Sequence, residues 1–201
     1  PYLSKDSSTK LLKNKELVIC SHGVFLLLGW ISALNRYQIK VLKNLDRAYK
    51  TLAHPSGKLL ALFETDQIVF RDMETFEIKG HQQLEPNCAL MSFHKDGRLL
   101  AYTVSAQLCK VELLDLLTGT VINIDNPDNE SPKEIIWAKN RIFMALSYRK
   151  RVDVFDLRKL TKVFSTVPDN FILSVIFSKN SEKIIILTEQ GLQVNSLKDS
   201  E

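Results

Sequence analysis

Short apolar runs alternate with polar turns along most of this chain of 201 residues. The runs last six or seven residues and are rich in valine, isoleucine and phenylalanine, which is typical of β-strands rather than helices. Four runs that begin with a basic residue start 40, 43 and 42 positions apart, at 58–63, 98–103, 141–146 and 183–188. This spacing predicts a repeat of about 40 residues.

Two further sets of segments recur in step with the first. Segments with alternating apolar residues follow the basic runs, at 68–73, 111–116, 152–157 and 192–197, and they predict half-buried strands. Turn-forming residues precede the basic runs, at 54–57, 94–97, 138–140 and 178–181, and they predict reversals between antiparallel strands. Helical repeats are excluded, because apolar residues do not recur at spacings of three and four over a dozen positions. The pattern predicts all-β repeats of four antiparallel strands, like the blades of a β-propeller.

The segment 80–115 opens with Gly80 and His81 and closes with Leu114 and Asp115. These two pairs resemble the Gly-His and Trp-Asp pairs of the WD40 repeat family. The neighbouring repeats close with Arg71, Asp72 and with Phe155, Asp156. No repeat carries a true Trp-Asp pair, so the buried network of His, turn Asp, strand hydroxyl and Trp that is typical of the family cannot be completed in any repeat. The resemblance covers about 46–197 and implies a fold more than a function.

The expected fold is an all-β, WD40-like β-propeller of about four to five blades, each with four antiparallel strands. Blades are expected at about 17–45, 46–86, 87–130, 131–169 and 170–201, after a flexible N-terminal segment at 1–16. The last copy stops after its third strand, which would leave an open sheet edge. Five blades could close into a ring if an N-terminal strand supplied the missing outer strand. We favour an incomplete ring, extended by further blades of a longer protein or completed by a partner chain.

Composition narrows the function classes without indicating one partner. Lysine and arginine total 27 and the acidic residues total 23, and the net charge of +4 is small for a dedicated nucleic-acid binder. The cysteines at 20, 88 and 109 are odd in number and far apart, which indicates buried thiols in an intracellular, cytoplasmic or nuclear protein. The segment 17–34 lacks charged residues, but Ser21, His22 and Gly23 interrupt it. It predicts two strands joined by a turn and no membrane span.

No catalytic, cofactor or metal site is expected. Cys20 and His22 are close enough to share a metal ion, but no second pair of ligands completes a tetrahedral site. His81 is expected to be the structural histidine of its Gly-His pair, and His54 and His94 are expected to be turn residues. The sequence has no Gly-x-Ser-x-Gly motif, and its seven glycines form no phosphate-binding loop. The sequence therefore predicts a protein that is not an enzyme.

The most distinctive charge cluster consists of Tyr148, Arg149, Lys150 and Arg151, in the expected turn between the second and third strands of one blade. Three cations could bind phosphates or an acidic peptide, and the tyrosine would offer a surface for stacking. The alternative interpretation is a solvated hairpin tip, since short basic turns are common on surfaces. The equivalent turns, at Asp66, Gln107 and Gln190, share no charge with this one. The turn is thus a candidate partner-binding site that symmetry does not repeat.

The expected function is that of a non-catalytic scaffold for protein interactions, as a WD40-like subunit of a multi-protein complex. The expected partners are other proteins, among them a chain that completes the propeller or pairs with its open edge. The alternative is a propeller that binds RNA or phosphate groups through the turn at 149–151, and it is less favoured because the overall charge is modest.

Overall fold

The computed structural model describes residues 8–11, 17–21, 24–31, 34, 36–44, 48, 50–64, 66–84, 90–104, 110–124, 130–140 and 142–197. These residues are all-β, with no α-helix among them, and every pair of neighbouring strands is antiparallel. The chain divides into two compact units, Pro1–Cys88 and Ala89–Glu201. The prediction of an all-β chain with four-stranded antiparallel sheets is therefore confirmed.

The first unit contains two sheets of four strands, which pair in chain order. One sheet consists of β1 (Ser8–Leu11), β2 (Leu17–Ser21), β3 (Val24–Ile31) and β4 (Arg36–Asn44). The other consists of β5 (Lys50–Ala53), β6 (Leu59–Phe63), β7 (Gln67–Asp72) and β8 (Ile78–Gln83). Alternate residues of β3, Phe25 and Leu27, pack with Leu60 and Leu62 of β6, because side chains two positions apart lie on one face of a strand.

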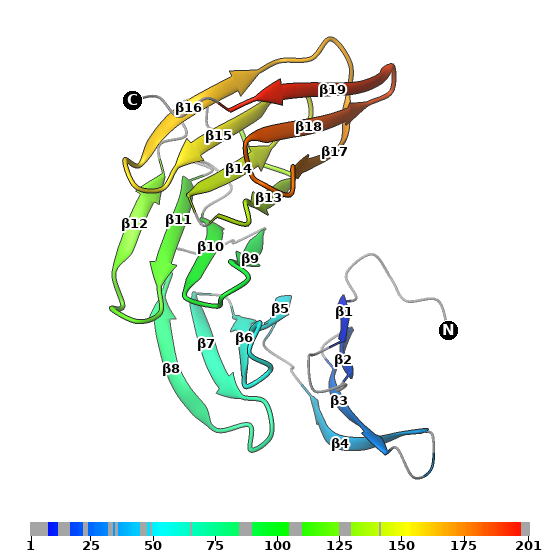
Figure 1. Cartoon of the computed structure of the whole chain (residues 1–201). Helices are drawn as coiled ribbons and strands as arrows, with labels where there is room; N and C mark the ends of the chain where they lie inside the picture. The colour runs from blue at the N-terminus through cyan, green and yellow to red at the C-terminus, as the bar shows by residue number, and fades with distance from the viewer. Residues whose placement is uncertain are drawn as a thin grey trace. The chain divides into compact units, whose positions relative to one another are not determined.

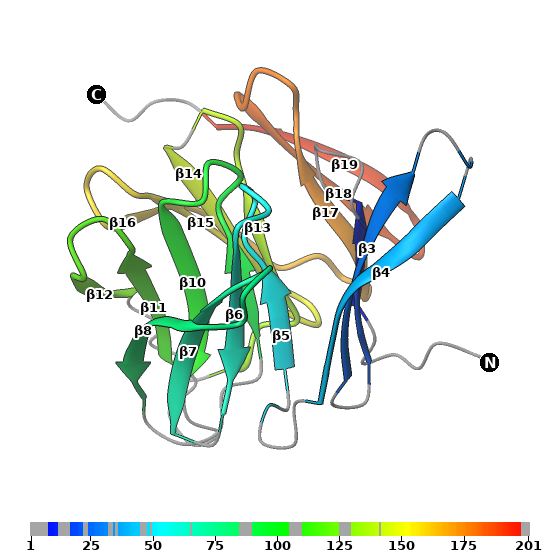
Figure 2. The same cartoon turned by 90° about the horizontal axis from the view of Figure 1, so that it is seen from below.

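The second unit contains three sheets, which follow one another in the views of Figure 1 and Figure 2. The first has the strands β9 (Met91–Phe93), β10 (Leu99–Val104), β11 (Lys110–Asp115) and β12 (Val121–Ile124). The second has β13 (Glu134–Trp137), β14 (Phe143–Ser147), β15 (Val152–Asp156) and β16 (Thr161–Thr166). The third has β17 (Ile172–Phe177), β18 (Lys183–Thr188) and β19 (Gly191–Ser196).

Sheet β13–β16 is buried on both faces, and this explains the continuous apolar run of its central strand β14. Met144 and Leu146 of β14 belong to a cluster shared with the sheet β9–β12. Phe143 and Ala145, which alternate with them, belong to a second cluster shared with the sheet β17–β19. All five residues of β14 are buried. The second unit is therefore held together by sheets packed face to face.

The turns at 54–57, 94–97 and 178–181 have one geometry, as their sequence pattern predicts. In each turn the backbone N–H of the first residue donates to a backbone carbonyl at the start of the following basic run, at 2.8 to 2.9 Å. The pairs are His54 to Leu59, His94 to Leu99 and Ser178 to Lys183. The fourth residue adopts a positive φ, of 74° at Gly57, 82° at Gly97 and 62° at Ser181. Glycine adopts this conformation without strain, so its place in two of the turns has a backbone cause.

Two expectations about the N-terminal part of the chain can be compared with the structure. The segment 17–34 forms the antiparallel strands β2 and β3, as predicted, and no helix in the described part of the chain has the length and apolarity to cross a membrane. The expectation of a flexible segment at 1–16 is wrong for residues 8–11, which form β1 and pair with β2. This pairing satisfies the backbone of β2 on its outer side. The other residues of that segment lie outside the described residues.

Candidate interaction site

The basic turn connects β14 to β15, where the sequence places it. Ser147 pairs with Val152 at the ends of the two strands, and the backbone N–H of Tyr148 donates to the carbonyl of Arg151 at 2.8 Å. The four predicted residues therefore form one closed hairpin turn. Their side chains, however, differ: Tyr148 is buried, Arg151 is half-buried, and Arg149 and Lys150 are exposed.

Tyr148 is fully buried and lies in the cluster between the sheets β9–β12 and β13–β16. Burial raises the pKa of Tyr148 to about 12, because the phenolate would lose its hydration, although the neighbouring Arg151 acts in the opposite direction. The ring packs in the core, so the expectation of an exposed tyrosine for stacking is wrong. Packing by the preceding sheet decides its position, and the turn sequence alone does not contain that information.

Arg151 is held within the protein by two carboxylates. Its Nε lies 3.2 Å from Asp153 Oδ2, its Nη2 lies 3.6 Å from Glu130 Oε2, and its side chain is 14 % exposed. The guanidinium also stacks on the Tyr148 ring, 4.2 Å from the ring centroid. Asp153 is itself buried and accepts a hydrogen bond from Ser165 Oγ at 2.6 Å. Arg151 therefore compensates a buried carboxylate and has a structural role.

Arg149 and Lys150 are the exposed cations of the turn. The Arg149 guanidinium lies 4.3 Å and the Lys150 ammonium 5.2 Å from the centroid of the Phe171 ring. The backbone N–H of Ile172 donates to the carbonyl of Arg149 at 3.1 Å. Phe171 therefore brings both cations together at the start of β17. Sequence reasoning missed Phe171, whose one signal was its position directly before an apolar strand.

The equivalent turns carry no such pair of cations in the described part of the chain. Between β6 and β7 the turn is closed by Glu64, whose N–H donates to the carbonyl of Gln67 at 2.9 Å, and Asp66 is exposed. Between β18 and β19 the turn residues are Glu189 and Gln190. Gln107 lies outside the described residues. In the described part of the chain, the cationic turn thus belongs to one sheet.

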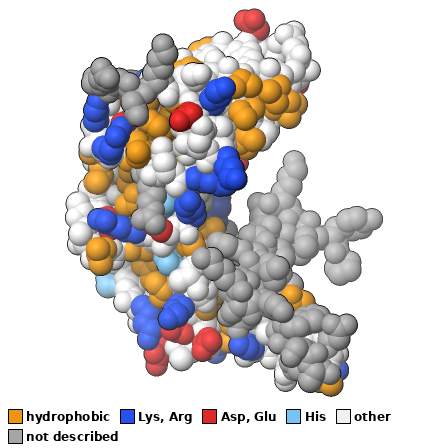
Figure 3. All heavy atoms as spheres, in the orientation of Figure 1, with side chains coloured by type: hydrophobic (Ala, Val, Ile, Leu, Met, Phe, Trp, Pro, Cys, Tyr) orange, Lys and Arg blue, Asp and Glu red, His pale blue; other side chains and the backbone are white. Residues whose placement is uncertain are grey.

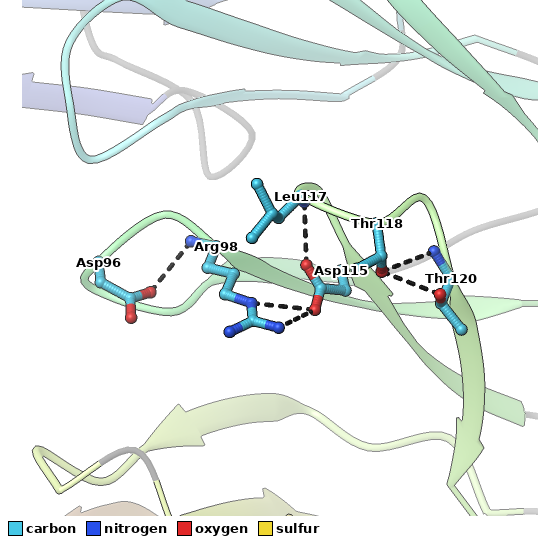
Figure 4. A network of polar contacts seen from close by, with 6 residues as sticks. All are labelled: Asp96, Arg98, Asp115, Leu117, Thr118 and Thr120. Atoms are coloured by element: carbon cyan, nitrogen blue, oxygen red, sulfur yellow. Dashed lines mark hydrogen bonds and ion pairs between the residues drawn. The ribbon is translucent and has the colours of Figure 1, made fainter.

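A second polar network joins the two ends of the β10–β11 hairpin (Figure 4). Arg98 Nε and Nη2 donate to Asp115 Oδ2 at 2.9 and 2.6 Å, and the N–H of Leu117 donates to Asp115 Oδ1 at 2.9 Å. The hydrogen bonds from Arg98 are the main cause that lowers the pKa of Asp115. Asp115 thus caps the turn after β11. The sequence marked this aspartate as the end of a repeat but did not predict its arginine partner.

Asp156 and Asp72, which end two of the other repeats, also cap the turns that follow them. Asp156 Oδ1 accepts from the N–H of Arg158 at 2.8 Å, and the Arg158 side chain donates to the same carboxylate. This hydrogen bond from Arg158 is the main cause that lowers the pKa of Asp156. Asp72 Oδ1 accepts from the N–H groups of Glu74 and Thr75, both at 2.9 Å. The three carboxylates stabilise the fold and form no shared site.

The histidines have structural environments that differ from one another. His94 is buried, its Nδ1 lies 2.7 Å from Asp96 Oδ1, and its ring meets Trp137 edge to face at a centroid distance of 5.3 Å. Trp137 Nε1 donates to Ser92 Oγ at 3.0 Å. A histidine, a turn aspartate, a hydroxyl and a tryptophan therefore lie together, but the tryptophan comes from β13, in the next sheet.

Of the other three histidines, one lies as the sequence predicts, one does not, and one lies outside the described residues. His54 Nδ1 lies 2.7 Å from Ser56 Oγ, so it is a turn residue like His94, as expected. His81, expected as a structural histidine, is exposed on β8. The candidate pair of Cys20 and His22 lies outside the residues whose side chains are described.

In the described part of the chain no three His, Cys, Asp or Glu side chains form a group that could hold a metal ion. Comparison with known proteins adds no family to this description: no protein-family model matches the chain, and no curated protein matches its sequence significantly.

Proposed function

We propose that this chain is a WD40-like β-propeller segment that acts as a non-catalytic scaffold in an intracellular multi-protein complex. In this proposal each sheet is one blade, so that four blades have four strands and the last has three. One observation carries the proposal: sheets of four antiparallel strands follow one another in chain order, and the second unit buries both faces of its middle sheet. Stacking of this kind is how propeller blades form a rigid body.

The scaffold role follows from the division between rigid faces and exposed turns. Buried sheet faces fix the strands, and the turns between them display side chains without disturbing the core. The turn that carries Arg149 and Lys150 is the best candidate contact, because Phe171 holds both cations in place. Acidic segments of protein partners would fit this surface by charge.

Affinity capture from native extract tests the scaffold role. The wild-type chain is compared with the double variant Arg149→Glu and Lys150→Glu, and with Lys95→Glu as a charge reversal on an exposed turn of another sheet. We expect the wild-type chain and Lys95→Glu to capture the same proteins at defined stoichiometry, and the double variant to lose at least one of them. Recovery of the bare chain in every case would contradict the proposal.

The same two cations favour a second candidate function, the binding of RNA or of other phosphate groups. Arg149 and Lys150 are exposed and lie over an aromatic ring, whereas Arg151 is already paired with carboxylates. Charge reversal of the exposed pair would remove two phosphate contacts, so the slope of log affinity against log salt for single-stranded RNA should become less steep by about 1.4. Unchanged binding and an unchanged slope would discard this function, and Lys95→Glu is again the control.

A further inference from the structure

The sheet β17–β19 has one buried and one exposed face, and apolar side chains occupy the middle of the exposed face too, with Lys183, Ser174 and Ser196 beside them. Val175, Ile184 and Ile186 face the sheet β13–β16 and belong to the cluster between the two sheets. The register pairs Ile176 with Ile185, Ile185 with Val194, and Leu187 with Leu192, so these residues share the opposite face. Among the apolar side chains on that face, Leu192 is 63 % exposed, Ile176 54 % and Val194 52 %.

Hydrophobic side chains gather in this region of the surface (Figure 3), at the upper right, where Figure 1 places β17 to β19. Single exposed apolar residues are ordinary, but adjacent residues on paired strands form a continuous patch. A patch of this kind on a sheet face is typical of a surface that another protein surface covers.

The internal repeat indicates what kind of surface covers this face. Val152 and Val154 of β15 are the counterparts of Leu192 and Val194 in the repeat, and both valines are fully buried. They are buried because the next sheet, β17–β19, packs on them. Val111 and Leu113 of β11 occupy the same repeat positions, and the sheet β13–β16 covers them. Positions equivalent to Leu192 and Val194 are therefore twice covered by a following sheet.

The chain itself carries a second apolar face of the complementary kind. In the first unit, Phe25 and Leu27 of β3 face the following sheet. On the other face, Leu26 pairs with Leu42. Leu28 pairs with Ile39 on the same face. Leu42 and Ile39 are 59 % and 58 % exposed. With the face that carries Leu42 and Ile39, a sheet of this chain packs on the sheet before it. With the face that β17–β19 leaves exposed, a sheet packs on the sheet after it.

We propose that the exposed face of β17–β19 binds the outer face of β1–β4 in a second copy of the chain. The contact is head to tail, because it joins two different faces and repeats the order in which the sheets pack within each unit. It deepens the proposed scaffold function and rests on it, since a propeller-like stack supplies the geometry. A head-to-tail contact that leaves one face free at each end adds further copies.

The experiment measures the mass of the purified full chain by light scattering and sedimentation over a range of concentrations. Leu192→Lys and Leu42→Lys each place a charge in one of the two faces, and both are expected to weaken self-association at least about tenfold. The matched controls are Gln193→Lys and Gln38→Lys, which add the same charge to the opposite face of the same strands. The controls are expected to associate like the wild type, and equal melting temperatures verify that all variants fold.

Mixing the two variants identifies the pair of faces. Leu192→Lys keeps an intact β1–β4 face and Leu42→Lys keeps an intact β17–β19 face, so the mixture should form a one-to-one pair that grows no further. A wild-type chain that stays monomeric up to about 1 mM, a concentration at which even weak contacts form, would overturn the proposal, as would a mixture that stays monomeric. The scaffold function would survive either result, because it fails only if affinity capture recovers no partner.

Discussion

Truncation of Val154 to alanine tests whether packing between sheets is the main source of stability in the second unit. Val154 is fully buried and belongs to the cluster that β13–β16 and β17–β19 share. The substitution removes two methyl groups, and at about 0.8 kcal/mol for each plus a contribution from the cavity, it should cost about 2 kcal/mol. Val194 is its counterpart in the repeat and is 52 % exposed, so Val194→Ala should cost less than about 0.5 kcal/mol.

The assay is urea denaturation, followed by the fluorescence of Trp137 in a Trp30→Phe background so that the signal reports the second unit. It is carried out at a low protein concentration, where self-association does not contribute to stability. At a typical slope of about 2 kcal/mol per molar, Val154→Ala should lower the urea midpoint by about 1 M, and Val194→Ala should leave it nearly unchanged. Equal shifts for the two variants would refute the assignment of a covered and an uncovered face.

Three further predictions concern the polar groups. Asp115→Asn should lower the melting temperature by a few degrees, because it removes the charge that Arg98 pairs with, and a melting curve identical to the wild type would contradict that role. The arginine partners lower the pKa values of Asp115 and Asp156, so these carboxylates stabilise the folded state above about pH 4. This stabilisation should be lost as the pH falls below that value, and thermal unfolding measured between about pH 5 and pH 2 checks the loss. The ionisation of Tyr148 can be followed by the tyrosinate absorbance in an alkaline titration, as the difference between the wild-type curve and the Tyr148→Phe curve. The difference should have its midpoint near pH 12, whereas a midpoint near pH 10 would indicate an exposed ring.

The second strand of a sheet could be predicted from the sequence because it is a clear apolar run: β14 is buried on both faces, and β18 carries isoleucine and leucine on its exposed face as well as on its buried face. The basic run at 141–146 overlaps β14, and the run at 183–188 is β18. The outer strands β8 and β16 gave no comparable signal, since all of their residues are half-buried or exposed. A strand at the edge of a sheet needs only backbone pairing on one side, so its sequence can remain polar.

The candidate site could be located from the sequence but not resolved into its parts. The run of cations identified the turn between β14 and β15, since such a run is rare in this chain. Which cation is exposed depends on Asp153 and Glu130, which hold Arg151, and on Phe171, which lies beneath Arg149. Asp153 follows Arg151 by two positions, but Glu130 and Phe171 come from segments before β13 and before β17, so the turn sequence does not contain them. Local pattern therefore found the place, and tertiary packing determined the available chemistry.

In the part of the chain that the structure describes, every sheet pairs only consecutive strands. Each of these sheets can form as soon as its own few dozen residues are available, because each strand pairs with the strand next to it in the sequence. Such local closure keeps the entropic cost of folding low for a β-rich chain and favours fast folding. It also means that duplication or deletion of a gene segment encoding about 40 residues would add or remove a whole sheet without disturbing the hydrogen-bond register of its neighbours.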